Sequence, residues 1–97
     1  MDSETTLRLL SEALPDLKRR FAVARLGLFG SVARNEAGPD SDVDILAEFE
    51  GPATLDGFMG LKADLEALLG TRVDLATPGS LRPSLMHLVE KDLHHVA

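Results

Sequence analysis

The spacing of the apolar residues changes repeatedly along this chain, and that change limits the folds it can adopt. Apolar positions recur at steps of three and four, as on one face of an amphipathic helix, in residues 7–21, 55–69 and 85–96. Short apolar runs of strand length alternate with these helical segments, at residues 25–29, 43–49 and 72–77. The alternation predicts a small α/β (α+β) fold, with a mixed sheet of at least three strands packed by helices.

Proline and capping residues set the expected ends of the first elements. Asp2 or Ser3 can cap the first helix. Pro15 is expected to divide it into a helix ending near residue 14 and a short helical turn over 15–20, because proline lacks a backbone donor and crowds the preceding turn. A second short helix, over 31–36, is expected directly after the first strand.

The last third of the chain should hold the end of one helix and the whole of another. Gly70 is expected to end the helix over 55–69, since glycine suits the left-handed position after a helix. The last helix should begin at Ser80 or Pro83 and turn five apolar residues inward: Leu85, Leu88, Val89, Leu93 and Val96. Three histidines lie towards its end and are expected to complement the helix dipole rather than bind metal: His87, His94 and His95.

Length and composition predict one domain over residues 1–97 and exclude several partners. The chain has 16 acidic and 10 basic residues, a formal net charge of −6, and neither tryptophan nor tyrosine. Nucleic-acid binding draws on concentrated Lys and Arg and on exposed aromatic rings, so no direct nucleic-acid partner is expected. No apolar run is long enough to span a bilayer, so no membrane association is expected. Because cysteine is also absent, the protein is expected to be cytoplasmic.

Carboxylates at every second position open the second predicted strand: Asp40, Asp42 and Asp44. One interpretation is the solvated face of an edge strand. A calcium loop of the EF-hand type is excluded, because its sixth residue must be Gly and its twelfth Glu, whereas this chain has Ile45 and Gly51. A third interpretation is a metal site, since residues two apart on a strand point to the same face and hard oxygen ligands suit Mg²⁺. Asp74, on the next predicted strand, is the candidate third carboxylate, although alone it could simply face outward.

Gly30 and Ser31 follow the first predicted strand and supply a candidate phosphate-binding turn. Glycine permits close approach of the backbone to a ligand, and the start of the helix behind it offers N–H groups to an anion. Arg34, one turn further on, could reach the same anion. A Gly-Ser step alone is common in turns, and the neighbouring carboxylate pair is what makes a nucleoside triphosphate with its metal the favoured ligand.

The segment "FGSVARNEAGPDSDVDILAEF" resembles the GSxAR…SDxD signature of minimal nucleotidyltransferase domains of the DNA polymerase β superfamily, and the resemblance covers nearly the whole chain. The matching residues are Gly30, Ser31, Ala33, Arg34, Ser41, Asp42 and Asp44. Two positions depart from the family's pattern: Asn35 stands where Gly is usual, and Val32 stands where an aromatic residue is frequent. Asp40 precedes the signature and is interpreted as a loop residue.

The resemblance implies a nucleotidyltransferase fold and a division of labour among these residues. Two Mg²⁺ ions would be held by Asp42, Asp44 and Asp74, and Asp74 would also act as general base. ATP would be bound by Gly30 and Ser31, with Arg34 and Ser41 as supporting residues. Members of this family are typically antitoxins that transfer AMP to a hydroxyl, reported as tyrosine, of a HEPN-domain RNase toxin.

No second domain that could bind an acceptor is recognisable in the chain, so the acceptor is expected on another molecule, in a hetero-oligomer with the toxin. Two alternatives remain open from the sequence. The chain could neutralise a HEPN toxin by binding alone, without catalysis. It could also modify a small molecule after completion by a separate subunit.

Overall fold

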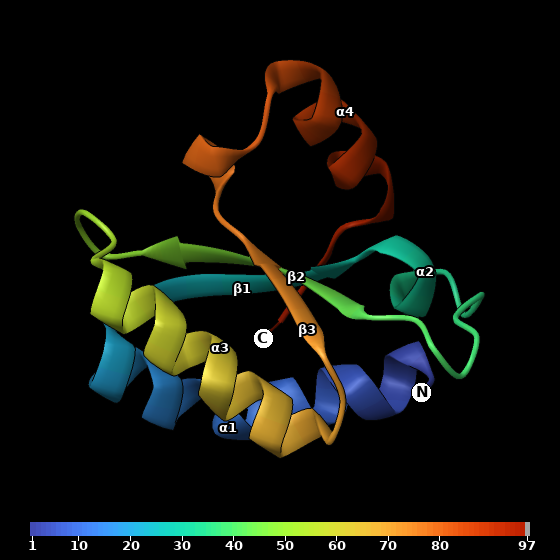
Figure 1. Ribbon diagram of the computed structural model, residues 1–97, viewed down its shortest axis with the longest axis horizontal. Helices are drawn as coiled ribbons and strands as arrows, with labels where there is room; N and C mark the ends of the chain where they lie inside the picture. The colour runs from blue at the N-terminus through green and yellow to red at the C-terminus, as the bar shows by residue number, and fades with distance from the viewer. Residues whose placement is uncertain (97) are drawn as a thin grey trace.

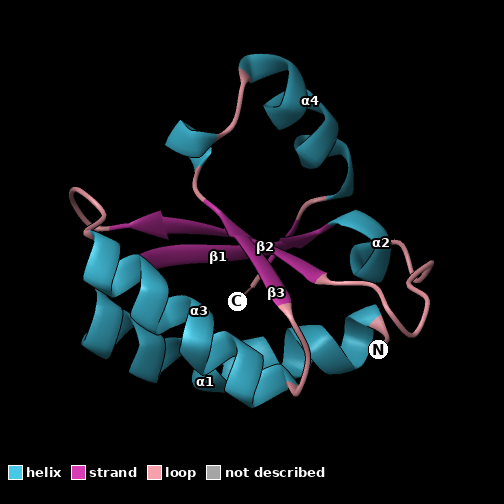
Figure 2. Cartoon of the chain, viewed as in Figure 1, coloured by secondary structure: helices cyan, strands magenta, loops and turns pink. Residues whose placement is uncertain are grey.

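The computed structural model describes residues 1–96, in which a four-stranded mixed sheet separates two layers of helices (Figures 1 and 2). The strand order is β3-β2-β1-β4, with β2 parallel to β3 and β1 antiparallel to both β2 and β4. Helices α1 and α3 cover one face of the sheet, and α4 stands over the other (Figure 1). The predicted architecture is therefore confirmed. The elements in chain order are α1 (Ser3–Phe21), β1 (Val23–Phe29), α2 (Gly30–Ala33), β2 (Val43–Phe49), α3 (Leu55–Leu69), β3 (Val73–Ala76), the 3₁₀ turn η1 (Pro78–Ser80), α4 (Pro83–Asp92) and β4 (His94–His95).

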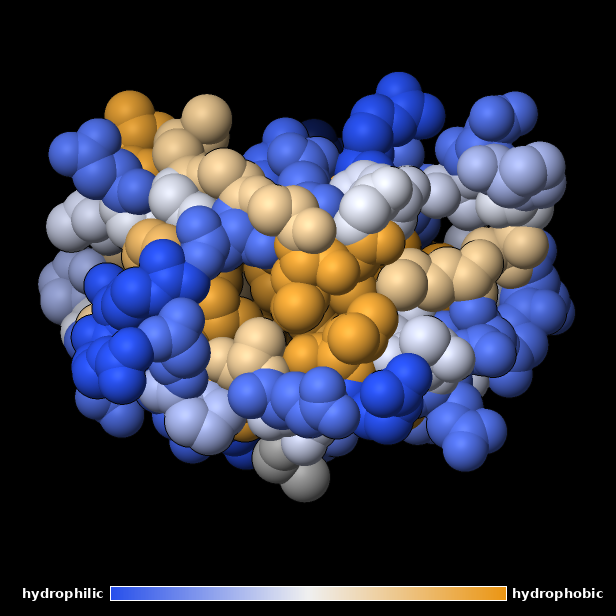
Figure 3. Space-filling view, turned by 90° about the horizontal axis from the view of Figure 1, so that it is seen from below, coloured by the Kyte–Doolittle hydropathy of each residue, from blue (hydrophilic) through white to orange (hydrophobic). Residues whose placement is uncertain are grey.

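The core lies between the sheet and the layer formed by α1 and α3. Alternate residues of the strands point into it, as the two-residue period of a strand requires. Its fully buried members, each with at most 1% of its surface exposed, include Leu10, Leu26, Leu28, Ile45, Leu61 and Leu65. Figure 3 views the molecule from the side of α1 and α3, where hydrophobic residues gather at the centre of the face within a polar rim.

Two predicted elements match the structure residue by residue. β2 spans Val43–Phe49, and α3 spans Leu55–Leu69. Gly70 ends α3 in the left-handed conformation, with φ of 69°, as expected. Asp2 caps α1, where its side chain accepts a hydrogen bond from the backbone N–H of Thr5.

The predicted break of the first helix at Pro15 is wrong, because α1 continues through it to Phe21. Pro15 is exposed, whereas Leu10, Leu14 and Leu17 on either side of it are buried. A proline inside a helix costs about 3 kcal/mol. Burying one leucine side chain contributes about 1.5–3 kcal/mol. Three buried leucines therefore outweigh the proline.

The predicted C-terminal helix is also wrong in its extent and its orientation. α4 ends at Asp92, and the chain then forms β4, where His94 and His95 pair with Leu28 and Gly27. These two histidines therefore lie on a sheet edge and do not complement a helix dipole. Leu85 and Leu88 were expected to face inward but are 46% and 55% exposed. The expectation holds for Val89 and Val96, which are buried.

The remaining differences are shorter or longer ends. The first strand begins earlier than expected, at Val23, and β3 is confined to Val73–Ala76. The short helix α2 starts at Gly30 and ends at Ala33, before the predicted end at residue 36. Within residues 1–96, no helix combines the length and the apolar character needed to cross a membrane.

Candidate active site

The three predicted carboxylates come together where β2 and β3 begin. Asp44 and Asp74 are register partners on these adjacent parallel strands. Asp42 precedes Asp44 by two residues and therefore points to the same side of the sheet. Val43, which separates Asp42 from Asp44, and Val73, which precedes Asp74, are buried in the core. The carboxylates consequently lie on the opposite face, the one over which α4 stands.

Burial and mutual repulsion both disfavour the ionised form of Asp44 in this cluster. Burial, followed by the nearby charges of Asp74 and Asp42, raises the pKa of Asp44 to about 6. A side-chain hydrogen bond with Asp74 acts in the same direction, and the charge of Arg34 acts against it. The Asp42 carboxylate lies 3.1 Å from the guanidinium of Arg72. A cation placed among these oxygens would relieve the repulsion.

The donor set fits Mg²⁺, although the side chains do not yet enclose an ion. Among residues 1–96, no three His, Cys, Asp or Glu side chains form a group arranged to hold a metal. The ion pair between Asp42 and Arg72 occupies one of the three carboxylates. Mg²⁺ usually takes one or two carboxylates and completes its shell with water and substrate phosphates, so the pair Asp44 and Asp74 suffices as an anchor.

Gly30 lies directly against Asp44, and only glycine fits there. Its φ is +74°, a conformation that other residues rarely adopt. A Cβ atom at this position would lie 2.1 Å from Oδ2 of Asp44. The contact follows from the register of the sheet, since Phe29 at the end of β1 is the partner of Asp44. The predicted phosphate-binding turn and the predicted metal ligands are thus adjacent.

Internal backbone hydrogen bonds hold this turn in shape. The N–H of Arg34 donates to the carbonyl oxygen of Gly30 at 3.2 Å, and the N–H of Glu36 donates to that of Ser31 at 2.8 Å. Ser31 is half-buried at the start of α2. The backbone of the turn is therefore held in one shape by its own hydrogen bonds. The turn lies next to the carboxylates, where we expect a triphosphate to bind.

Arg34 and Ser41 are engaged in other contacts. The guanidinium of Arg34 lies 2.8 Å from the carboxylate of Glu36 and 2.5 Å from that of Asp92 on α4. Ser41 accepts a hydrogen bond from the N–H of Gly38 through its hydroxyl oxygen, at 3.0 Å, and so closes the loop before β2. Asp40 is exposed in the same loop, as predicted. The nucleotide-binding roles of Arg34 and Ser41 stay predictions.

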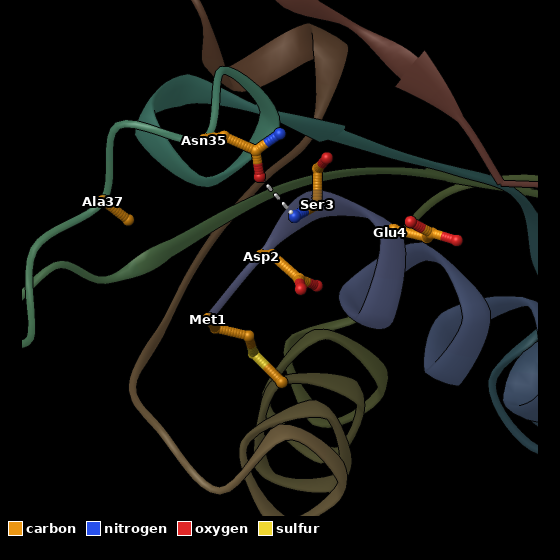
Figure 4. A pocket seen from close by; sticks show the side chains of 6 residues that line it. All are labelled: Met1, Asp2, Ser3, Glu4, Asn35 and Ala37. Carbon is orange, nitrogen blue, oxygen red and sulfur yellow. Dashed lines mark hydrogen bonds between the residues drawn. The ribbon is translucent and has the colours of Figure 1, made fainter.

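Asn35 tolerates a left-handed backbone, as its residue type allows, but its contact with the N-terminus was not predicted from the sequence. It adopts a left-handed conformation with φ of 58°, and its side-chain oxygen accepts a hydrogen bond from the N–H of Ser3 at 2.9 Å (Figure 4). This bond joins the turn after α2 to the N-terminus of α1, beside a pocket of about 550 Å³. The sequence signal for a structural role was that Asn35 stands where the family usually has glycine. Asp2 and Glu4 line the pocket and give it acidic walls that do not suit a phosphate.

Comparison with known proteins agrees with this geometry. Residues 10–94 match the family model of the nucleotidyltransferase domain. Over 88 residues the chain is 43% identical to the protein adenylyltransferase MntA of Thermococcus cleftensis, which covers 91% of this chain and 89% of that protein. The chain belongs to the nucleotidyltransferase family.

Solved structures of other proteins share the fold of this nucleotidyltransferase. A minimal nucleotidyltransferase superposes with a TM-score of 0.81 at 45% identity, covering 97% of this chain and 95% of the other. The antitoxin in a complex of tri-AMPylated HEPN toxin with MNT antitoxin from Shewanella oneidensis superposes with a TM-score of 0.67, covering 94% of this chain and 71% of that one. Its identity is only 20%, so it supports the fold alone. The resemblance inferred from the GSxAR…SDxD segment is confirmed, and the chain is a homologue of a protein adenylyltransferase.

Proposed function

We propose that this nucleotidyltransferase transfers AMP from ATP to a hydroxyl side chain of a HEPN-domain partner protein and thereby neutralises it as a toxin. The observation that carries the proposal is the contact of Gly30 with Asp44, which places a backbone turn suited to phosphates against a carboxylate that pairs with Asp74. Homology to a protein adenylyltransferase supports AMP as the transferred group and protein as the acceptor. The two proteins would form a hetero-oligomer while the transfer takes place.

The reaction is an in-line displacement at the α-phosphorus of ATP. The acceptor oxygen forms a new bond to that phosphorus, the bond to the bridging oxygen breaks, and pyrophosphate leaves with the electron pair. Asp74 accepts the proton of the acceptor hydroxyl as general base. Asp74 is suited to this because it is exposed, whereas its register partner Asp44 is half-buried.

The other residues bind and orient the triphosphate. Gly30 and Ser31 would hold the β- and γ-phosphates through the start of α2, with Arg34 and Ser41 beside them. Asp42, Asp44 and Asp74 would hold two Mg²⁺ ions, which supply positive charge to the attacking and leaving oxygens. Arg72 would have to release Asp42 for it to bind a metal, and the exposure of that ion pair makes its separation inexpensive.

The test is the double substitution Asp42→Asn and Asp44→Asn, assayed for transfer of labelled AMP from ATP to the co-expressed partner. We expect transfer to fall by about 10³-fold or more, because metal-assisted charge stabilisation contributes several kcal/mol. The matched control is Glu12→Gln with Glu50→Gln, which removes two exposed carboxylates elsewhere and should keep activity. A double aspartate variant that still labels the partner would end the proposal. A double variant that neutralises the toxin without labelling it would indicate inhibition by binding alone.

A further inference from the structure

A second concavity lies on the same face of the sheet as the carboxylates, between that face and α4. It has a volume of about 380 Å³. Arg25, Leu46 and Glu48 form its floor on β1 and β2, and Met86, Glu90 and Leu93 line it from the side of α4. Figure 1 shows that α4 stands over this face of the sheet. We refer to this concavity as the α4 cleft.

The α4 cleft is fixed relative to the candidate active site along β2. Leu46 follows Asp44 by two residues and points to the same face, so their side chains lie one repeat apart, about 6–7 Å. The ion pair between Arg34 and Asp92, at 2.5 Å, joins the turn after Gly30 to the end of α4. The phosphate-binding turn, the carboxylates and the cleft are therefore held in fixed positions relative to one another.

The register of β1 and β2 sets the order of these three parts. Phe29 pairs with Asp44, Gly27 with Leu46, and Arg25 with Glu48. Movement along β2 from Asp44 to Glu48 is therefore movement along β1 away from Gly30. Asp44 therefore lies between the phosphate-binding turn on one side and the α4 cleft on the other.

In-line displacement then indicates what occupies the cleft. The leaving pyrophosphate and the attacking oxygen lie on opposite sides of the α-phosphorus. If Gly30 and Ser31 hold the pyrophosphate end, the attacking oxygen enters from the side away from Gly30, which is the side of the cleft. The ribose leaves the phosphorus at right angles to this line and so does not point directly along it.

We propose that the α4 cleft is the acceptor subsite, and that Glu90 recognises a positively charged residue beside the acceptor hydroxyl of the partner. This inference rests on the proposed function. Leu46, Met86 and Leu93 offer apolar contacts to an acceptor side chain that spans the repeat between Leu46 and Asp44. Glu48 is neutralised by Arg25 at 2.8 Å, whereas Glu90 makes no ion pair with any described residue of the chain. The unpaired charge of Glu90 in a protein of net charge −6 favours a basic segment.

Two substitutions in the cleft, each with a matched control on the opposite layer, test the proposal. Glu90→Arg reverses the unpaired charge, and Glu12→Arg makes the same change on α1. Met86→Trp fills the cleft, and Met59→Trp places the same ring on the exposed side of α3. The assay measures kcat and KM for the HEPN-domain partner with labelled ATP. ATP binding with Mg²⁺ is measured separately without the partner.

We expect Glu90→Arg to raise KM for the partner about five- to tenfold and Met86→Trp to raise it more than about tenfold. Affinity for ATP should stay within about twofold of the wild type in both. Replacing the Arg or Lys residues that flank the labelled hydroxyl of the partner by Glu should restore KM for Glu90→Arg and not for the wild type. Such rescue would not follow if Glu90 served only the structure of α4.

Three results would overturn the inference. Weakened ATP binding in Met86→Trp would show that the nucleoside occupies the cleft. A KM equal to that of the control variants would show that the acceptor enters elsewhere, and a lack of rescue would exclude recognition of charge by Glu90. If the wild type and the controls transfer no AMP, the proposed function fails and the inference with it. If they transfer AMP and the cleft variants match them, the inference alone fails.

Discussion

The two faces of the sheet are built from the same strands and have opposite properties. On the face covered by α1 and α3, Val43, Ile45 and Ala47 of β2 are at most 1% exposed. On the face towards α4 lie Asp42, directly before the strand, and Asp44, Leu46 and Glu48 within it, so that three of these four side chains are acidic. The two-residue period of a strand thus lets one segment contribute stability with one side and chemistry with the other.

This division explains how a small protein can tolerate a repulsive site. Clustered carboxylates reduce stability when they are ionised without a partner. The layer of α1 and α3 compensates with a continuous apolar core that includes none of the acidic residues. α4 is packed more loosely, with Leu85 and Leu88 exposed, and so leaves the second face open to substrates.

Substitution in the closed face should give the largest loss of stability and leave chemistry intact. Leu65 is fully buried on α3, so Leu65→Ala should lower the free energy of unfolding by about 2–5 kcal/mol. Leu88→Ala removes the same atoms from the exposed side of α4 and should cost less than about 0.5 kcal/mol. Urea denaturation measures both. The comparison would break if the two variants were equally destabilised, or if folded Leu65→Ala lost AMP transfer.

The same contrast separates what the sequence could predict from what it could not. β2 and α3 were predicted residue by residue because their signals are local: an apolar run before Gly51, and a helical period before Gly70. The continuity of α1 through Pro15 depends on packing against the core. β4 depends on pairing with Gly27 and Leu28, more than 60 residues earlier in the chain. Neither kind of long-range contact can be read from a short window.

The candidate site divides in the same way. Asp42 and Asp44 lie on one face because of a local period, which sequence alone predicts. Asp74 reaches them only through the parallel pairing of β2 with β3, a long-range contact that no local pattern encodes. The ion pairs of Arg34 with Asp92 and of Asp42 with Arg72 join residues distant in sequence, so the engagement of these charges could not be foreseen.

The carboxylates on the face towards α4 should make the stability of the protein depend on pH in the absence of divalent cations. The pKa of Asp44 is raised to about 6 by burial and by Asp74 and Asp42, against the opposing charge of Arg34. The folded state therefore binds a proton more tightly than the unfolded state, whose pKa is near 3.8. Stability from this group is complete below about pH 4 and is lost as pH rises through about 6. After allowance for solvent screening, we expect a loss of about 1–2 kcal/mol.

Asp44→Asn should remove this slope and make the metal-free protein more stable than the wild type at pH 8. Glu50→Gln, an exposed carboxylate beyond the end of β2, should keep the wild-type slope. Mg²⁺ should stabilise the wild type at pH 8 and have little effect on Asp44→Asn, because binding to the folded state alone raises its stability. Thermal denaturation from pH 4 to pH 8, with and without MgCl₂, measures these differences. A wild type whose stability without metal depends on pH in the same way as that of Asp44→Asn would contradict the assignment.

The smallest effect is expected for Asn35, which lies where the active-site side of the molecule meets the helix layer on the other face of the sheet. It ties the turn beside the active site to the start of α1, the helix that supports the core. Asn35→Ala loses the hydrogen bond from Ser3 and places alanine, which has a Cβ atom, in the left-handed conformation at φ of 58°. Together these changes should lower the free energy of unfolding by about 1–2 kcal/mol. Asn35→Gly loses the same bond but relieves the backbone strain, so its stability should stay within about 0.5 kcal/mol of the wild type. Asn35→Asp keeps the acceptor oxygen and serves as the control.

If the hydrogen bond between Asn35 and Ser3 also positions the turn, Asn35→Ala and Asn35→Gly should both raise KM for ATP while Asn35→Asp does not. Equal KM values in all three variants would confine Asn35 to a role in stability.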